Sequence, residues 1–189
     1  MQLNIYLISH PIINKLSTEI IYSTSKDNCI HTHTYSQLNL FLIYEVLRRY
    51  IKIQNIYVKH LKYTKEICIF YPKESYLFLA NIEEYGSTIT NIKTIIPKVH
   101  VIHTIFNSKI KEYIQNSITN IIKKQKIIII EKLLDNFSII QLLDYLIIDN
   151  NINIDTVKIV CIACTNNILE IIGNKYPSLK IYTTKIINH

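Results

Sequence analysis

The chain has 189 residues and a formal net charge of +7, with 49% hydrophobic and 19% charged residues. This composition supports a packed core and excludes a disordered protein. The two glycines, Gly86 and Gly173, are too few for a phosphate-binding loop built on a glycine run. We expect one domain over residues 1–189.

Residues with A/T-rich codons dominate the chain, which has 43 Ile, 19 Lys and 18 Asn but only two Arg, Arg48 and Arg49. This bias indicates a compact, A/T-rich genome, and we expect a plastid-encoded protein, or otherwise a cytoplasmic one. Because residues 3–8 read as a strand directly after Met1, no targeting segment is expected. Codon bias also accounts for the lysine excess, so we expect no nucleic-acid partner, and no apolar run suggests a membrane partner.

Hydrophobic patterning predicts alternating strands and helices along the chain. Helices are expected over residues 34–51, 88–96, 136–149 and 167–175. Strands are expected over residues 3–8, 53–58, 67–71, 75–80, 99–105, 127–130, 157–163 and 179–183. The polar segment 107–125 reads as a loop or hairpin.

The run Ile127–Ile130 is the strongest strand signal, because four β-branched residues without alternation are typical of a parallel strand buried on both faces. Strands that alternate with helices after residue 75 predict an α/β fold with a mainly parallel β-sheet flanked by helices. Ligands of such sheets bind at the carboxyl ends of the strands. The turn expected at residues 131–139 is therefore the first place to look for a site.

Two groups of metal-ligating residue types are interpreted as structural. Cys161 and Cys164 have C-x-x-C spacing but lie in a strand-like apolar run, where we expect their side chains on opposite faces of the sheet. His31 and His33 are expected in a polar loop. We predict no metal site.

Four segments resemble motifs of the uracil phosphoribosyltransferases, a family of type I phosphoribosyltransferases. They match H-P-L-I-x-x-K-L, L-x-Y-E-V-x-R, L-L-P-x-A-x-V-x-H and H-P-x-x-x-I-Y-T, and they fall in the family's order at residues 10–16, 42–48, 95–103 and 176–183. The resemblance implies a type I phosphoribosyltransferase-like fold and a homodimer. It also implies a reaction of uracil with phosphoribosyl pyrophosphate that gives UMP and pyrophosphate, with Mg²⁺ if the protein is active.

The departures from the family pattern concern the chemistry. The family's phosphate loop, D-P-M-L-A-T-G-G-S, aligns with residues 131–139, so its two glycines fall on Phe137 and Ser138. The degenerate counterparts of its phosphate-binding residues are Glu131, Lys132, Asp135, Asn136 and Ser138. The family's R-A-G-L-G loop aligns with residues 83–87, where Glu83 replaces an arginine, and Glu83 and Gly86 are the degenerate counterparts of its pyrophosphate-binding loop. The family's uracil loop, Y-I-V-P-G-L-G-D, has no counterpart before His189.

These departures favour a homologue with degraded substrate motifs that is weakly active or inactive, with phosphoribosyl pyrophosphate or a uridine nucleotide as the ligand to test. The alternatives are a non-catalytic dimeric scaffold, a nucleotide-binding protein, and an RNA-binding protein that uses Lys123, Lys124 and Lys126. We further expect Asp135 to cap the helix that follows it. Glu45 and Arg48 should form a structural ion pair on one helix face.

Overall fold

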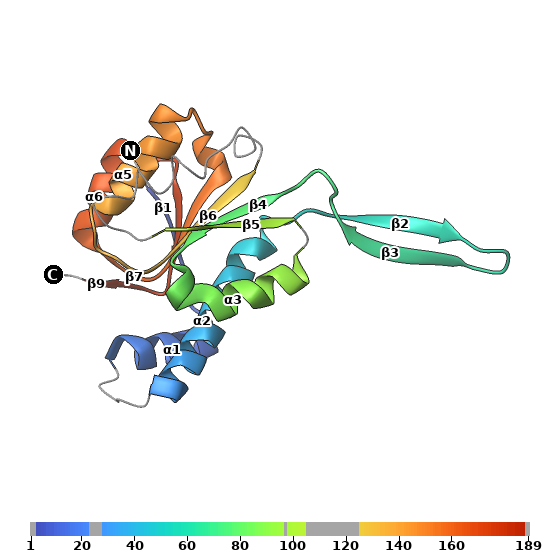
Figure 1. Cartoon of the computed structure of the whole chain (residues 1–189), viewed down its shortest axis with the longest axis horizontal. Helices are drawn as coiled ribbons and strands as arrows, with labels where there is room; N and C mark the ends of the chain where they lie inside the picture. Colours follow the sequence, from blue (N-terminus) through green and yellow to red (C-terminus); the bar gives the residue numbers. More distant parts are fainter. Residues whose placement is uncertain (1–2, 23–27, 97, 105–124, 188–189) are drawn as a thin grey trace.

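The computed structural model describes residues 3–22, 28–96, 98–104 and 125–187 (Figure 1). The expected loop at 107–125 and the lysines Lys123 and Lys124 lie outside these residues, apart from Gln125.

A parallel sheet forms the centre of the molecule. Its strands follow the order β1-β8-β7-β6-β4-β5, and β9 pairs with the end of β7. Each of these pairings is parallel, so the predicted α/β fold class is confirmed. The bounds are Asn4–Leu7 for β1, Tyr76–Ala80 for β4, Val99–His103 for β5, Lys126–Leu134 for β6, Val157–Thr165 for β7, Lys180–Thr183 for β8 and Lys185–Ile187 for β9.

Helices cover both faces of the sheet (Figure 1). One face packs against α1 (Pro11–Tyr22), α2 (Asn28–Arg48) and α3 (Ile82–Ile95). The other face packs against α5 (Ser138–Leu143), the π-helical turn η2 (Asp144–Asp149) that continues it, and α6 (Asn166–Lys175). A short 3₁₀ turn, η3 (Ile154–Thr156), precedes β7.

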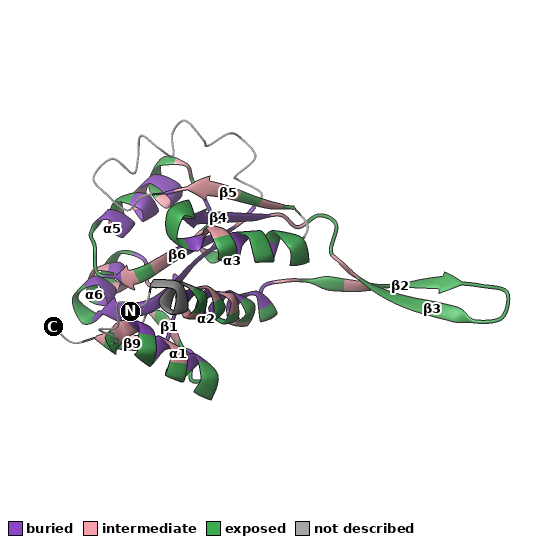
Figure 2. Ribbon diagram, turned by 60° about the horizontal axis from the view of Figure 1, so that its bottom comes forward, coloured by how far each residue is buried: buried purple, intermediate pink, exposed green. Residues whose placement is uncertain are grey.

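Burial on both faces explains why the central strands are apolar without alternation. Every residue of β4 and β7 is buried, as are the four isoleucines Ile127–Ile130 of β6 (Figure 2). Side chains of odd-numbered residues such as Ile127 and Ile129 join one core, and those of Ile128 and Ile130 join the other. The run predicted as a buried parallel strand is therefore confirmed.

An antiparallel hairpin leaves the body as a long arm (Figure 1). It consists of β2 (Ile53–Lys59) and β3 (Thr64–Phe70), which pair with each other and not with the main sheet. Almost every residue of the arm is exposed (Figure 2). Both strands were predicted, but their place outside the sheet was not.

Several element boundaries differ from the sequence predictions. β6 does not end at Ile130 but continues to Leu134, so Glu131 and Lys132 are strand residues and not loop residues. The helix expected from residue 88 begins at Ile82, which places Glu83 and Gly86 in a helix instead of a loop. The long helix begins at Asn28, so His31 and His33 also lie in a helix.

The prediction that Cys161 and Cys164 face opposite sides of the sheet is wrong. Both side chains belong to the same core cluster, together with Ile159, although an odd number of steps separates them. In the neighbouring strand β6, the alternation of side chains between the two faces of the sheet is also interrupted. Leu134 lies in the core that holds Ile127 and Ile129, although an odd number of steps separates it from them. A thiol interaction with Cys164, reinforced by burial, raises the pKa of Cys161, and the same interaction lowers the pKa of Cys164.

Candidate functional site

The sheet changes direction of winding between β4 and β6. The chain leaves β4, forms β5 on one side of it, and returns as β6 on the other side. Two neighbouring parallel strands whose connections run in opposite directions leave a crevice at their carboxyl ends, where ligands of α/β proteins bind. The residues that follow these strands, beginning at Asn81 and Asp135, therefore form the candidate site.

The first turn of α3 follows β4, and its backbone N–H groups are occupied. The N–H of Ile82 donates to Nδ1 of His103 at 3.0 Å, and the N–H of Glu83 donates to Oδ1 of Asn81 at 3.1 Å. The N–H groups of Glu84 and Tyr85 both donate to the carbonyl of Asn81. These are the groups that a phosphate would bind at a helix start. The chain itself satisfies all four.

The start of α5 after β6 is satisfied in the same way. Oδ1 of Asn136 accepts hydrogen bonds from the backbone N–H of Ser138 at 3.1 Å and from its hydroxyl at 3.0 Å. The next N–H groups donate to the carbonyls of Asn136 and Phe137. The residue expected to cap this helix was Asp135, but Asp135 is exposed, Phe137 occupies the N-cap position, and the side chain that binds the N–H of Ser138 is that of Asn136.

Glu131 is the titratable group with the most altered environment at this edge of the sheet. Burial raises its pKa to about 8, and the nearby carboxylates of Glu84 and Asp135 add to the shift. A hydrogen bond from the N–H of Lys132 to Oε1 of Glu131, at 3.2 Å, opposes it. Glu131 is thus mainly protonated at neutral pH, whereas Asp135 and Glu83 are exposed to solvent.

A tyrosine cluster lies beside Glu131. The hydroxyl of Tyr35 donates to Oε2 of Glu84 at 3.4 Å, and the Tyr35 and Tyr85 rings lie 5.6 Å apart. The ammonium of Lys132 lies 5.5 Å from the centre of the Tyr35 ring, so this side chain turns toward α2 and not toward a ligand at the strand end.

The pocket at the end of β6 is small, with a volume of about 90 Å³. Glu131, Asp135 and Asn136 line it, so three of the residues predicted from the sequence are brought together. Small-molecule sites usually enclose about 300–1,000 Å³. The pocket has room for a few water molecules and not for a sugar phosphate.

The other predicted site residues lie apart from this pocket. Ser138 is buried and hydrogen-bonds to Asn136, whereas Glu83 is exposed on α3. A Cβ atom at Gly86 would meet Cγ2 of Ile82 at 3.9 Å, an ordinary contact, so this glycine does not serve a close backbone approach. Asn81, His103 and Tyr35 were missed. Asn81 could have been predicted from the sequence, because an asparagine followed by Glu83 and Glu84 is typical of a helix start.

No group of three or more His, Cys, Asp or Glu side chains suited to a metal ion occurs within residues 3–22, 28–96, 98–104 and 125–187. The carboxyl groups that line the pocket are those of Glu131 and Asp135. Mg²⁺ is usually held by one or two carboxylates together with substrate phosphates, so these two side chains are the ones that would hold the ion beside a bound substrate.

The ion pair predicted between Glu45 and Arg48 is confirmed, with Nη2 of Arg48 3.2 Å from Oε2 of Glu45. Lys126, proposed from the sequence as part of an RNA-binding cluster, pairs instead with Glu74 at 2.5 Å.

None of the helices in the described parts of the chain is long and apolar enough to cross a membrane.

Comparison with known proteins supports the resemblance. The chain is 27% identical over 191 residues to a protein of Porphyra purpurea named "Uracil phosphoribosyltransferase homolog", covering 98% of this chain and 89% of that protein. It is 26% identical to a protein of the same name from Pyropia yezoensis, with the same coverage. No family model matches the chain.

Among solved structures, the chain is similar to the AQ2163 protein from Aquifex aeolicus. The TM-score is 0.68 at 15% sequence identity, and the match covers 98% of this chain and 88% of the other. At this identity the similarity concerns the fold alone, and it agrees with the parallel sheet and flanking helices described above.

Proposed function

We propose that this chain, a divergent homologue of uracil phosphoribosyltransferase, has kept the fold of that family without an efficient phosphoribosyl transfer activity. The observation that carries this proposal is the state of the carboxyl edge of the sheet. There Asn136 occupies the N–H of Ser138, and the exposed carboxylate of Asp135 stands next to it.

Transfer of a phosphoribosyl group requires the enzyme to hold a 5′-phosphate and a pyrophosphate, both strongly anionic. Such groups bind where free backbone N–H groups and positive charge converge. Here the helix starts of α3 and α5 present N–H groups that are already hydrogen-bonded. The neighbouring carboxylates of Glu83, Glu84 and Asp135 outnumber the ammonium group of Lys132, which turns toward Tyr35. A phosphate at this edge would have to displace Asn136 and would also be repelled.

Glu131 and Asp135 would hold Mg²⁺ only together with a substrate phosphate, and we derive no step that uses the ion. Phosphoribosyl pyrophosphate and uridine nucleotides are the ligands to test first, because the resemblance implies them. We further propose that the protein is plastid-encoded, which is supported by its A/T-rich codon usage and by the red-algal origin of the two relatives.

An assay of UMP formation from uracil and phosphoribosyl pyrophosphate, with Mg²⁺, tests the proposal. The full chain should give a rate at least about 10³-fold below that of an active uracil phosphoribosyltransferase measured alongside, which corresponds to about 4 kcal/mol of lost transition-state stabilisation. A rate within about tenfold of the active enzyme would overturn the proposal, provided that Asp135→Asn or Glu131→Gln changes that rate.

A further inference from the structure

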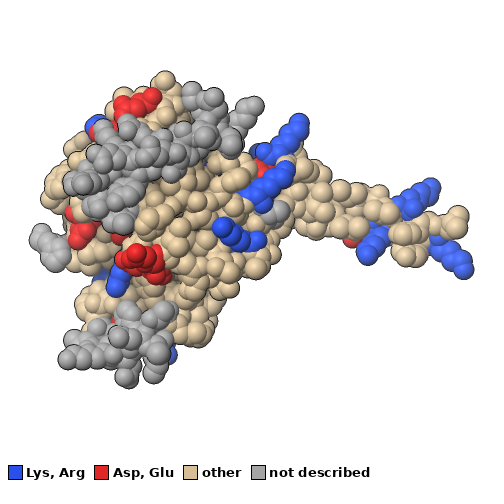
Figure 3. Space-filling view, viewed as in Figure 1, with Lys and Arg blue, Asp and Glu red and all other residues tan. Residues whose placement is uncertain are grey.

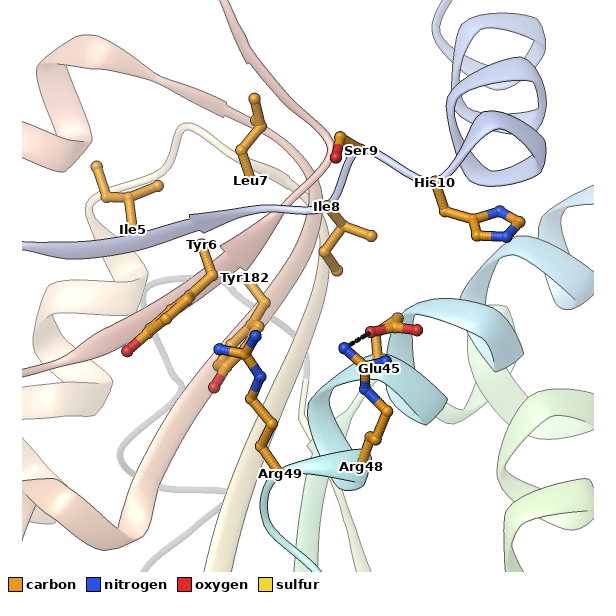
Figure 4. Close-up of a pocket in the computed structure, with 10 residues that line it drawn as sticks. All are labelled: Ile5, Tyr6, Leu7, Ile8, Ser9, His10, Glu45, Arg48, Arg49 and Tyr182. Atoms are coloured by element: carbon orange, nitrogen blue, oxygen red, sulfur yellow. Dashed lines mark ion pairs between the residues drawn. The ribbon is translucent and has the colours of Figure 1, made fainter.

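A second and larger cleft lies beside the edge strand β1, away from the carboxyl ends of β4 and β6 (Figure 4). Its volume is about 520 Å³, within the usual range for small-molecule sites. Residues 5–10 form one wall, the last turns of α2 form another, and Tyr182 of β8 lies at its base. The cleft shares no residue with the pocket at the end of β6.

The only two arginines of the chain, Arg48 and Arg49, both line this cleft. Arg48 pairs with Glu45, whose carboxylate also lines it. Among the described residues, no carboxylate lies within ion-pair distance of Arg49, whose guanidinium lies 5.8 Å from the centre of the Tyr6 ring. Arg49 therefore keeps its hydrogen-bond donors available for a ligand.

The base of the cleft is a pair of stacked tyrosines with a cation beneath it. The Tyr6 and Tyr182 rings lie 4.8 Å apart at 13°. On the inner side, the ammonium of Lys158 lies 5.6 Å from the Tyr182 ring and 4.1 Å from that of Tyr50. Lys158 is only 5% exposed, and burial lowers its pKa to about 8, so it is still mainly charged at neutral pH. The charged residues that line the cleft are thus Arg48 and Arg49 against Glu45, and Lys158 adds a positive charge next to the Tyr182 ring.

The segment after β1 contributes neutral donors. Nδ1 of His10 accepts a hydrogen bond from the N–H of Ile12 at 3.3 Å, which places the proton of a neutral ring on Nε2. Figure 4 shows Ser9 and His10 on the β1 side of the cleft, with Arg48, the last residue of α2, and Arg49, which follows it, on the opposite side. The imidazole can therefore donate from Nε2 while it helps to fix the start of α1.

We propose that this cleft binds the phosphate group of a small phosphate monoester, with Arg49 as the principal ligand and Arg48 and His10 as additional donors. A guanidinium binds two oxygens of a phosphate or carboxylate at once, and the three terminal oxygens of a phosphate match two guanidinium groups and one imidazole better than the two oxygens of a carboxylate do. Arg48 can share its donors between Glu45 and the ligand. The buried charge of Lys158 favours a dianion over a monoanion.

Calorimetric titration of the full chain with ribose 5-phosphate, ribose and succinate tests this proposal. Ribose 5-phosphate should bind, whereas ribose should not, and succinate should bind at least about tenfold more weakly. Ribose binding as tightly as its phosphate, or succinate binding equally well, would overturn the assignment to phosphate. Absence of binding at millimolar ribose 5-phosphate would overturn the site itself.

Variants locate the binding. Arg49→Gln should weaken the binding of ribose 5-phosphate by about tenfold or more, and Arg49→Lys should lie between that variant and the wild type, because lysine keeps the charge but loses the bidentate geometry. Lys62→Gln, which removes one charge from the exposed end of the arm, where Figure 3 shows basic side chains, is the matched control and should change the affinity by less than about twofold. Equal affinities of Arg49→Gln and Lys62→Gln, with both variants folded in thermal unfolding, would refute the site. This result is independent of the proposed loss of transferase activity, which concerns other residues.

Discussion

The ammonium of Lys126 lies 2.5 Å from the carboxylate of Glu74 in an ion pair that joins the first residue of β6 to the segment between the arm and β4. The side chains are only 20% and 13% exposed. Lys126 also donates to the carbonyl of Tyr50 at 2.5 Å, and the hydroxyl of Tyr76 donates to Glu74. The pair thus connects α2, the base of the arm and the sheet.

Lys126→Ala should lower the free energy of unfolding by about 2–4 kcal/mol, because it leaves Glu74 largely buried without its counter-charge. Burial alone would raise the pKa of Glu74, but the hydrogen bonds from Lys126 and Tyr76 outweigh it and the pKa is lowered. The pair therefore stabilises the fold above about pH 4.5 and loses this effect as the pH falls through the pKa of the folded state. Urea unfolding of the wild type and Lys126→Ala at pH 7 and pH 4 measures the loss of stability and its dependence on pH. Lys93→Ala on the exposed face of α3 is the control.

Glu131→Gln should stabilise the protein at alkaline pH and not at acid pH. The pKa of Glu131 is about 8 in the folded chain and 4.5 for an unperturbed glutamate side chain, so between these values only the unfolded chain releases the proton. Stability therefore falls as the pH rises from about 4.5 to 8. The glutamine removes this cost, which we estimate at about 2–4 kcal/mol at pH 8.

Urea unfolding of wild type and Glu131→Gln at pH 4.5 and pH 8 gives the required comparison. Glu83→Gln, at an exposed position, is the matched control and should show no such dependence on pH. Equal differences between wild type and Glu131→Gln at the two pH values would show that Glu131 titrates normally.

Cys161 and Cys164 should not bind zinc, although their side chains share one core and the geometric reason first given for this prediction is wrong. Two buried thiols supply half of a tetrahedral site, and the described residues add no third ligand. Metal analysis of the purified protein should find less than about 0.1 zinc per chain. Stoichiometric zinc that disappears in Cys161→Ser would contradict this.

The arm should bury its apolar face in a homodimer. Ile56, Val58, Ile67 and Ile69 share that face, because Ile56 pairs with Ile67 and the other two lie two residues away along each strand. Gln54 and Lys65 complete that face. The opposite face carries Asn55 and Tyr57, which both donate to Glu66, together with Ile53 and Phe70. A two-stranded hairpin is only marginally stable alone in water, so cover from a second chain would stabilise it.

Light scattering at micromolar concentration measures the oligomeric state. The wild type should be a dimer, and the double change Ile56→Lys, Ile67→Lys should give a folded monomer, because two buried charges without partners would oppose association. Tyr57→Lys on the opposite face of the arm is the control and should stay dimeric. A monomeric wild type would contradict the prediction.

The strands that carry runs of β-branched residues could be predicted from the sequence. The predictions failed where charged residues lie within a strand, and where segments far apart in the sequence come together. Glu131 and Lys132 read as a turn because charged residues are rare in buried strands, yet pairing of Leu133 and Leu134 with β7 extends β6 past them. The arginine cleft could not be foreseen. Its walls come from β1, α2 and β8, and their approach is fixed by pairing of β1 with β8 near the end of the chain.

A phosphate site should be recoverable at the start of α5, and the structure identifies Asn136 as the residue to change. Phe137 has φ −62° and ψ −16°, an ordinary right-handed conformation, so replacing it with glycine relieves no strain. The N–H of Ser138 is instead blocked by Oδ1 of Asn136, and Asp135 adds repulsion. The carboxylate at about 5 Å from a doubly charged phosphate costs roughly 6–7 kcal/mol at an effective dielectric constant of about 20, before screening by salt.

The double change Asp135→Thr, Asn136→Ala should therefore bind ribose 5-phosphate at this helix start, whereas Asp135→Thr alone should not. The measurement is made in an Arg49→Gln background, so that binding at the arginine cleft does not contribute. Asp155→Thr, which removes a carboxylate from η3, is the charge-matched control. If the double variant binds no better than Asp155→Thr, the blocked N–H groups are not what prevents phosphate binding. Binding by the background protein itself, abolished by bulky substitution at Ser138, would mean that the site is still functional and would revive the transferase.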